Sequence, residues 1–423
     1  MKKIKAILLA LLSISSISLV AQKNCTTFES IYALISQKDF FKATEQYELQ
    51  KTNLTHVHQY IIEAHLLNAF NQIESSNQKI NWLIHSKTKL ADSLVYKLYK
   101  IKEDNAVKRY DYKEAKKSIE YIIQNYGRFI SEYIRKNAEN NLKIWTALAN
   151  QPAQLVKIKE QTRLKMNKDK AGLNNLTICT EKDSSNFIFD TGANISTVTE
   201  TTAKILGMKL IPASIQVGTI TGEDVYANLA ICPMLKLGSI EIRNSIFLVL
   251  KDDALKFAEI NYQINGILGY PIIEALKQVQ TTRDGHFIVL KDTIKETLLP
   301  NLAMDELTPL IVLNNRLFTL DTGADSTLLY SPYYLENQQE IVANNTVSIV
   351  NLGGAAGVRA FKAYKKDFHI AVNDKIFVLK NVSILPTYFD EKRSSIYGNI
   401  GQDLIQQCES MTINFINMSI KFD

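Results

Sequence analysis

Two different hydrophobic patterns divide the chain. Between residues 26 and 150, apolar residues recur three and four positions apart, as at Ile31, Leu34 and Ile35, and glycine and proline are almost absent. This spacing gathers apolar side chains on one face of a helix, so it predicts a series of packed helices. Beyond about residue 160, short apolar runs alternate with turn residues, which predicts a mainly-β region.

The helical region shows a weak internal period. Asp39, Asn77 and Asp111 each stand at a polar turn where a helix is expected to begin, and they are 38 and 34 positions apart. This spacing is similar to that of tetratricopeptide-type helical hairpins. Two interpretations stay open: a concave surface that binds a peptide or partner protein, or a plain bundle that covers or steadies the rest of the protein.

The β region contains one short sequence twice. Residues 187–193 read Phe-Ile-Phe-Asp-Thr-Gly-Ala and residues 318–324 read Phe-Thr-Leu-Asp-Thr-Gly-Ala, so the aspartates are 321 − 190 = 131 positions apart. Each apolar run predicts a buried strand that ends at an acid, a hydroxyl and a turn-forming glycine. A carboxylate among apolar neighbours is costly, so both aspartates need partners or a task.

Other features recur near the same offset. Glycine-containing hairpins are expected at 218–222 and 353–357, and apolar segments with glycine follow at 264–269 and 396–401. A tight hairpin is also expected at Asn314-Asn315, because asparagine tolerates positive φ. A repeat of this length predicts two similar lobes, each contributing one aspartate.

These motifs carry a resemblance to a known family. Asp190-Thr-Gly-Ala and Asp321-Thr-Gly-Ala, with their apolar glycine-containing partners, resemble the aspartic peptidases of the retropepsin and pepsin group, over roughly residues 165–423. The resemblance implies a multidomain protein in which a mainly-β, bilobal acid-protease domain follows an all-α helical-hairpin domain. The expected boundaries are a signal peptide at 1–21, the helical domain at 22–160, the first lobe at 161–292, a linker at 293–306 and the second lobe at 307–423.

The resemblance also implies a role for each motif residue. Asp190 and Asp321 would form a catalytic dyad that activates water to hydrolyse a peptide bond, so the chain is expected to be an aspartic-type endopeptidase acting on a peptide or protein. Residues expected to support the dyad are Thr191 and Thr322, which would brace the opposite loop, and Gly192 and Gly323, which would let the backbone approach a carboxylate. The flap candidates are Thr219, Ile220, Thr221, Gly222, Leu352, Gly353, Gly354 and Ala355.

A detail of the motifs leads to a hypothesis about pH. Two carboxylates about 3 Å apart share one proton and titrate as a pair. Both motifs have alanine after the glycine, at Ala193 and Ala324, where pepsins usually have a hydroxyl that would stabilise the ionised carboxylate. Without that hydroxyl, the dyad is expected to keep its proton to higher pH and to work at mildly acidic to neutral pH.

The composition excludes some classes of function but does not indicate a particular one. A hydrophobic content of 46% and a charged content of 22% are ordinary for a globular protein of 423 residues. The formal net charge of +6 is mild and spread along the chain, so no nucleic-acid partner is expected. The six histidines and four cysteines match no metal spacing, so neither a metal nor a cofactor is expected.

The N-terminus and the cysteines bear on location. Residues 1–21 have a basic start, a short apolar stretch and small residues, the layout of a secretory signal. The mature chain is therefore expected to be exported to the periplasm or beyond, with no membrane span, as a monomer whose two lobes pair within one chain.

Cys25, Cys179, Cys232 and Cys408 leave two alternatives: a disulfide, with Cys179–Cys232 the nearest pair in sequence, or buried thiols.

Two other functions stay open at this stage. One is a peptide-binding protein on a protease fold without turnover, although both Asp-Thr-Gly motifs are intact. The other is an adaptor whose helical region binds a protein partner. A related hypothesis about control is that the helical domain restrains the cleft between the lobes.

Overall fold

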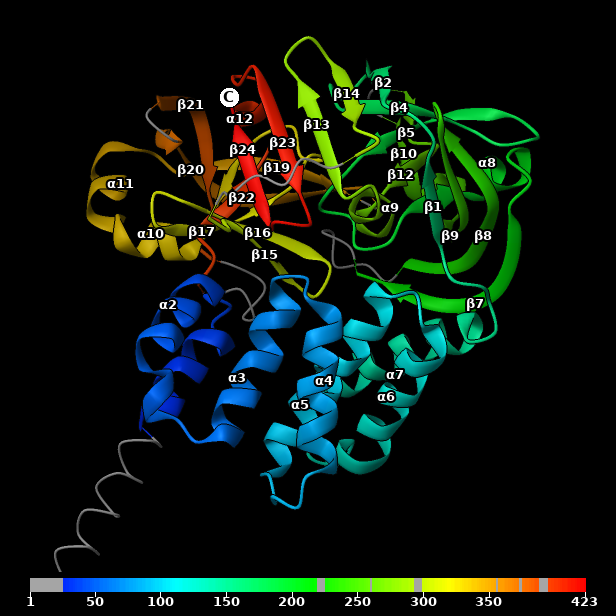
Figure 1. Cartoon of the computed structure of the whole chain (residues 1–423). Helices are drawn as coiled ribbons and strands as arrows, with labels where there is room; N and C mark the ends of the chain where they lie inside the picture. The colour runs from blue at the N-terminus through cyan, green and yellow to red at the C-terminus, as the bar shows by residue number, and fades with distance from the viewer. Residues whose placement is uncertain are drawn as a thin grey trace, which may run out of the picture.

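The fold was analysed in a computed structural model, which describes residues 26–218, 225–258, 261–292, 299–354, 357–372, 375–387 and 395–423. The N-terminal part is entirely helical, and residues 26–36 form its first helix. Sequential helices pack against one another as antiparallel pairs in an arc (Figure 1). The helices that follow are α2 (Phe40–Gln50), α3 (His56–Ala69), α4 (Ile73–His85), α5 (Asp92–Lys108), α6 (Tyr112–Tyr126) and α7 (Glu132–Leu148).

The turns between these helices partly correct the expected period. Asp39 caps α2 and Asp111 caps α6, each accepting a hydrogen bond from a backbone N–H of the first turn. Asn77 instead lies inside α4, so that position was wrong. The equivalent turn is at Asn71, which has positive φ just before the helix, as Lys38 and Tyr110 do before α2 and α6.

A first β unit follows the helices. Its strands run in the order β1-β9-β6-β12-β5-β4-β8-β7, and β8 also pairs with β9, which closes the middle of the sheet into a ring. The elements are β1 (Leu155–Ile158), β3 (Asn167–Lys168), β4 (Asn174–Cys179), β5 (Ser184–Phe189), β6 (Thr197–Thr199), α8 (Glu200–Ile205), β7 (Lys209–Val217), β8 (Val225–Leu237), β9 (Ile240–Leu250), β10 (Lys256–Phe257), β11 (Tyr262–Gln263), β12 (Gly266–Leu268) and α9 (Tyr270–Ala275).

A second β unit repeats this plan. Its order is β15-β16-β17-β22-β18-β21-β20-β19, and β17 pairs in parallel with β22 just as β5 does with β12. The start of β22 follows that of β12 by 398 − 266 = 132 positions. The elements are β15 (Leu302–Asp305), β16 (Thr308–Leu313), β17 (Arg316–Leu320), β18 (Leu328–Leu329), α10 (Ser331–Glu336), α11 (Gln338–Asn344), β19 (Ser348–Gly354), β20 (Gly357–Val372), β21 (Lys375–Ile384), β22 (Gly398–Ile400) and α12 (Gln402–Ile405).

A third sheet joins the two units. It has the order β2-β14-β13-β23-β24, in which β13 of the first unit pairs antiparallel with β23 of the second. The pairing sets Gln280 opposite Thr412, again 132 positions apart, so the two halves meet as near copies of each other. Its strands are β2 (Thr162–Lys165), β13 (Gln278–Thr282), β14 (His286–Val289), β23 (Ser410–Asn414) and β24 (Ser419–Phe422).

Two short strands lie where the sequence predicted other structure. β1 falls in the range expected to be helical, yet it pairs with β9 of the first unit. β15 falls in the expected linker, yet Leu302, Ala303 and Met304 are buried and the strand pairs with β16. Both strands are only four residues long. β1 takes its conformation from a distant partner, which local sequence does not reveal, whereas β15 forms a tight hairpin with the next strand, β16.

The helices pack against both β units (Figure 1). Trp145 and Leu148 of α7 share one buried cluster with the core of the first unit, while Ala303 and Leu310 of the second unit share another with the earlier helices. Tyr110 donates to the carbonyl of Pro271 at 2.8 Å. Because the helical part is buried against both units, it can fix how they sit relative to each other.

The structure bears on two further expectations. Among the described residues, no helix is long and apolar enough to cross a membrane. Cys179, Cys232 and Cys408 are free thiols, so the disulfide alternative for Cys179 and Cys232 is wrong. Burial raises the pKa of Cys232 and Cys408 to about 11, as expected for thiols packed in a core. Cys25 and the expected signal peptide lie outside the described residues.

Candidate active site

The fold brings the two Asp-Thr-Gly motifs together. Each aspartate follows a central strand, β5 or β17, and its backbone N–H donates to the parallel neighbour: Asp190 to Leu268 at 3.1 Å and Asp321 to Ile400 at 3.0 Å. The loops then turn back beneath the carboxyl groups. Gly192 N–H donates to Asp190 Oδ1 at 2.7 Å, and Gly323 N–H donates to Asp321 Oδ1 at 2.9 Å.

The two loops interlock through their threonines. The Thr191 hydroxyl donates to the carbonyl of Leu320 at 2.8 Å, and the Thr322 hydroxyl donates to the carbonyl of Phe189 at 2.8 Å. Each hydroxyl oxygen also accepts the other threonine's backbone N–H, at 3.0 and 3.1 Å. Both threonines are 1% exposed, so these four hydrogen bonds satisfy groups that water cannot reach.

Glycine is required where the loops cross. A Cβ at Gly192 would lie 2.7 Å from Asp321 Cγ, and a Cβ at Gly323 would lie 2.3 Å from Asp190 Cγ. Gly269 and Gly401 have an equivalent role below the loops, where an added Cβ would lie within 2.6 Å of the loop backbone. The absence of side chains thus lets each carboxyl group approach the opposite loop.

The carboxyl groups perturb one another. Both are partly exposed, yet the surrounding protein removes much of the bulk water from Asp190. This desolvation, together with the charge of Asp321 and a hydrogen bond between the two carboxyl groups, raises the pKa of Asp190 well above its ordinary value. Such a pair holds a proton at pH values where an isolated aspartate would have lost it.

A side chain outside the motifs completes the site. Asn399 on β22 donates from Nδ2 to Asp321 Oδ2 at 3.1 Å. The sequence analysis missed this residue, because the contact depends on the pairing of β17 with β22 and not on the motif. A signal was available: Asn399 is a polar residue inside the apolar segment 396–401, where the first copy has Ile267.

The expected flaps are hairpins where the structure describes them. β19 and β20 pair as far as Gly354 and Gly357, with Leu352 and Gly353 in β19; Ala355 lies outside the described residues. A Cβ at Gly353 would lie 3.2 Å from the ring of Phe257, so this hairpin reaches across to the first unit. In the first unit, β7 and β8 form the corresponding hairpin, but Thr219, Ile220, Thr221 and Gly222 lie outside the described residues.

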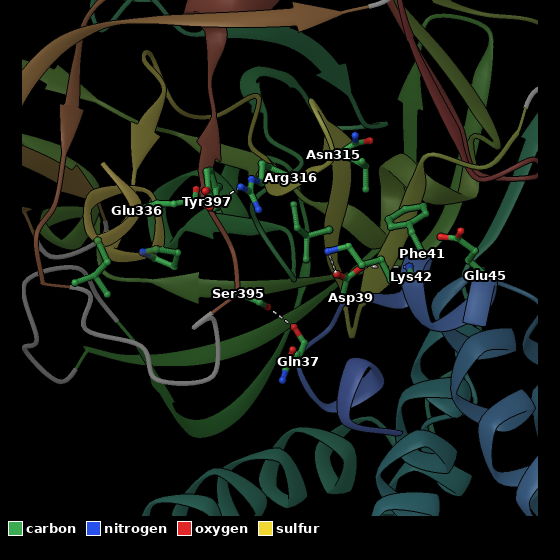
Figure 2. Close-up of a pocket in the computed structure, with 14 residues that line it drawn as sticks. Gln37, Asp39, Phe41, Lys42, Glu45, Asn315, Arg316, Glu336, Ser395 and Tyr397 are labelled. Atoms are coloured by element: carbon green, nitrogen blue, oxygen red, sulfur yellow. Dashed lines mark hydrogen bonds and ion pairs between the residues drawn. The ribbon is translucent and has the colours of Figure 1, made fainter. Parts of the chain in front are cut away.

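A separate pocket lies away from the two aspartates. A cavity of about 810 Å³ lies between α2 and the second β unit (Figure 2). Arg316 faces it, with its guanidinium paired with Glu336 and placed 4.7 Å from the centre of the Tyr397 ring. Neither dyad aspartate lines this cavity, and four of its charged side chains form the pairs Lys42–Asp39 and Arg316–Glu336. Among the described residues, no group of three or more potential ligands is placed to hold a metal.

Part of the first β unit matches a known protein family. Residues 176–272 match the model of a family described as aspartyl protease, and this range includes Asp190. The solved structure of a retropepsin-like aspartic protease from Rickettsia conorii is 19% identical, with a TM-score of 0.24, and the match covers 33% of this chain and 96% of that one. No curated protein matches the chain. The family match supports an aspartyl protease character for the first β unit, where the first Asp-Thr-Gly motif lies.

Proposed function

We propose that the chain is an aspartic endopeptidase whose catalytic dyad is Asp190 and Asp321, one from each β unit. The single observation that carries the proposal is the shared carboxyl pair, in which each aspartate accepts from its own loop and the threonines lock the loops together. A binding protein has no need of a proton-sharing pair of carboxyl groups. The aspartyl protease match over residues 176–272 supports the same function.

The chemistry follows from one proton shared by two carboxyl groups. The ionised aspartate accepts a proton from a water molecule as the water oxygen attacks the peptide carbon, while the protonated aspartate donates to the carbonyl oxygen. When the tetrahedral intermediate collapses, the C–N bond breaks, the leaving nitrogen takes the proton gained from water, and the other aspartate regains its own. Water is the nucleophile, so no covalent enzyme intermediate forms and no cofactor is required.

The remaining parts would prepare the site for this step. Thr191 and Thr322 would hold the two carboxyl groups at a fixed separation, which matters because small displacements of reacting groups are costly in rate. The β19–β20 hairpin, in which Gly353 approaches Phe257, would cover a bound peptide. Since both aspartates come from one chain, the proposed enzyme needs no second subunit.

Further proposals concern export and the helical part of the chain. Residues 1–21 would direct export, which places the substrate outside the cytoplasm. The helical part would hold the two β units in register, because it shares buried clusters with both. Because its helices resemble tetratricopeptide-type hairpins, the same domain would also bind a protein partner.

The direct test is cleavage of a mixed peptide library by the chain from Gln22 across pH, with Asp190→Asn and Asp321→Asn as variants. Either substitution is expected to abolish cleavage, because the remaining carboxyl group cannot act as both acid and base. Asp367→Asn is the matched control, since Asp367 is a half-buried aspartate of β20 that pairs with Lys380 and not with the dyad. If one dyad variant keeps the parental rate, the two-aspartate mechanism is wrong.

A further inference from the structure

The two aspartates have different neighbours at one equivalent position. In the second β unit, Thr319 of β17 lies opposite Asn399 of β22, and the Asn399 amide donates to Asp321 Oδ2 at 3.1 Å. In the first β unit, the same pair of positions is Ile188 opposite Ile267. The repeat therefore offers a side-chain donor to one aspartate and only apolar groups to the other.

The orientation of the Asn399 amide is set by a hydrogen bond to its oxygen. The hydroxyl of Thr319, a residue that is 3% exposed, donates to Asn399 Oδ1 and also lies 3.4 Å from the Gly398 carbonyl. With the amide oxygen engaged, the NH₂ group is left to face Asp321. Thr319 and Asn399 thus form a short chain of donors that ends on the carboxyl group.

This chain favours one charge state of the dyad. Asp321 accepts on both oxygens, from Gly323 N–H on Oδ1 and from Asn399 on Oδ2, and a carboxylate is stabilised by each donor that it accepts. Asp190 accepts from Gly192 on Oδ1, and the Ala193 N–H also favours its ionised form, but no side chain donates to it from the equivalent of the donor chain, because both residues there are isoleucine. An ionised carboxylate is therefore better accommodated at Asp321 than at Asp190.

We propose that Asn399, oriented by Thr319, is a positioning residue that keeps Asp321 ionised, so that Asp190 carries the proton of the dyad. The assignment rests on the proposed peptidase function and specifies it. Asp321 accepts the proton of the attacking water, and Asp190 donates its proton to the peptide carbonyl oxygen. On collapse, Asp321 gives its proton to the leaving nitrogen and Asp190 recovers one from a hydroxyl of the intermediate.

Other charged groups near the second loop do not replace this effect. Asp403 of α12 accepts from the Thr327 hydroxyl at 2.6 Å, and Asp325 is exposed and accepts from Ser326. Opposite Asp321, the titratable group is Asp190 itself, whose pKa is raised by desolvation first and then by the Asp321 charge. No cation is among the causes that shift the pKa of Asp190.

Phenyl glycidyl ether tests the assignment without requiring peptide cleavage. An ionised carboxylate opens the epoxide by forming a C–O bond to carbon while the epoxide C–O bond breaks, and a neighbouring protonated acid supplies the proton to the released oxygen. Peptide mapping by mass spectrometry then locates the ester. In the parent chain we expect the ester on Asp321, with at least a tenfold excess over Asp190.

Substitutions at Asn399 and Thr319 should change how the ester is distributed between Asp321 and Asp190. Asn399→Leu, of similar shape but without a donor, should reduce that excess about tenfold, and Thr319→Val should reduce it less. Thr319→Ser keeps the hydroxyl and should restore the parental ratio. A parent ester on Asp190, no ester on either aspartate, or an unchanged ratio in both Asn399→Leu and Thr319→Val would overturn the assignment.

Peptide cleavage provides the second readout. Removing a donor to the ionised carboxylate disfavours the ionised form, so the acidic limb of the kcat/KM profile should move to higher pH in Asn399→Leu. A general loss of structure would lower the rate at every pH without that shift. If the parent takes the ester on Asp321 but cleaves no peptide, only the peptidase function is refuted. If the parent cleaves peptides but the ester ratio is the same in the parent and in both donor-chain variants, only the assignment is refuted.

Discussion

The two β units are close copies in strand order but differ in how each treats its aspartate. In both, a central strand ends in Asp-Thr-Gly, a parallel neighbour accepts the aspartate N–H, and a glycine of the loop donates back to the carboxyl group. In the second unit a polar pair, Thr319 and Asn399, continues this network, whereas the first unit has two isoleucines. The shared features place two carboxyl groups together, and the differing ones make them inequivalent.

A second difference lies in the outer hairpins. The β7 strand of the first unit is held from outside by α7, where the Asn140 side chain bonds both the N–H and the C=O of Gln216 at 2.8 Å. The β19–β20 hairpin of the second unit instead reaches Phe257 of the first. One hairpin is thus tied to the helical domain and the other to the opposite unit, so the two sides of the site should differ in mobility.

The largest expected effect comes from filling the space between the loops. Gly323→Ala and Gly192→Ala each force a carboxyl group to move, since the added Cβ would lie within 3 Å of the opposite aspartate. A displacement of about 1 Å costs on the order of 10²-fold in rate, so kcat/KM should fall by at least that factor. Gly323→Ala should be the worse of the two, because its contact is closer.

A glycine outside the site serves as the control. Gly172 has positive φ and open space around its Cβ position, so Gly172→Ala costs only backbone strain of about 1 kcal/mol. Its kcat/KM should stay at the parental value. Parental rates in both loop variants would show that the carboxyl groups tolerate displacement and would contradict the tight crossing of the loops.

Loss of the threonine hydroxyls should chiefly reduce stability. Thr322→Val leaves the Phe189 carbonyl and the Thr191 N–H without their partner in a buried position. Each unsatisfied group costs about 1–3 kcal/mol, so the free energy of unfolding should fall by about 3 kcal/mol, and similarly for Thr191→Val. Chemical denaturation of both single variants and the double variant measures this.

The double variant tests whether the two units are coupled. Because each hydroxyl serves the other's loop, the two losses should not add, and the interaction energy should exceed about 0.5 kcal/mol. Thr191→Ser and Thr322→Ser keep the hydroxyls and should stay near the parental stability. Strict additivity would mean that the two loops are held independently.

Much of this comparison could be predicted from local sequence, and the rest could not. The twin motifs, their 131-residue offset and the Asn314-Asn315 hairpin depend on residues a few positions apart, and both asparagines do have positive φ. Asn399 could have been noticed as a polar residue in an apolar segment, but its contact with Asp321 could not be predicted, because the contact arises from pairing two strands about 80 positions apart. The expected linker was wrong for a different reason: β15 pairs with β16 across residues 306–307, so this hairpin was a local feature that the pattern of the repeat did not bring out.

In the helical region, the weak sequence period predicted only some of the turns correctly. Polar turns before helices were expected at Asp39, Asn77 and Asp111, and two of these residues do cap helices. Asn77 is polar for another reason: its side chain accepts from Asn105 at 2.9 Å within the bundle. A buried polar contact and a turn have the same sequence signal, and only the packing distinguishes them.

A smaller effect is expected in the pH dependence of stability. The pKa of Asp190 is higher in the folded chain than in the unfolded chain, so the folded state binds a proton that the unfolded state has released. The stabilisation is therefore fully present below about pH 4 and is lost as pH rises toward the folded pKa. Asp190→Asn, which mimics the neutral acid, should avoid this loss.

The measurement is the free energy of unfolding of parent and Asp190→Asn between pH 3.5 and 8. The variant should gain on the parent by about 1.4 kcal/mol for each pH unit above 4 until Asp190 ionises. Asp367→Asn should show no such gain, because the hydrogen bond from Lys380 lowers the pKa of Asp367 in the folded chain. A constant difference between Asp190→Asn and parent across this range would mean that folding does not raise the Asp190 pKa.

The smallest expected effect concerns the hairpin held by the helical domain. Asn140→Leu removes two hydrogen bonds to Gln216 at the edge of the first unit, just before the β7–β8 turn. The contact is exposed and worth about 1 kcal/mol, so hydrogen exchange in peptides covering β7 should quicken about fivefold. Glu139→Gln is the matched control, because Glu139 pairs with Arg135 on the same helix. Exchange in β19 should not change, since that hairpin contacts the opposite unit; equal acceleration in β7 and β19 would show that the two hairpins move together and are not held separately.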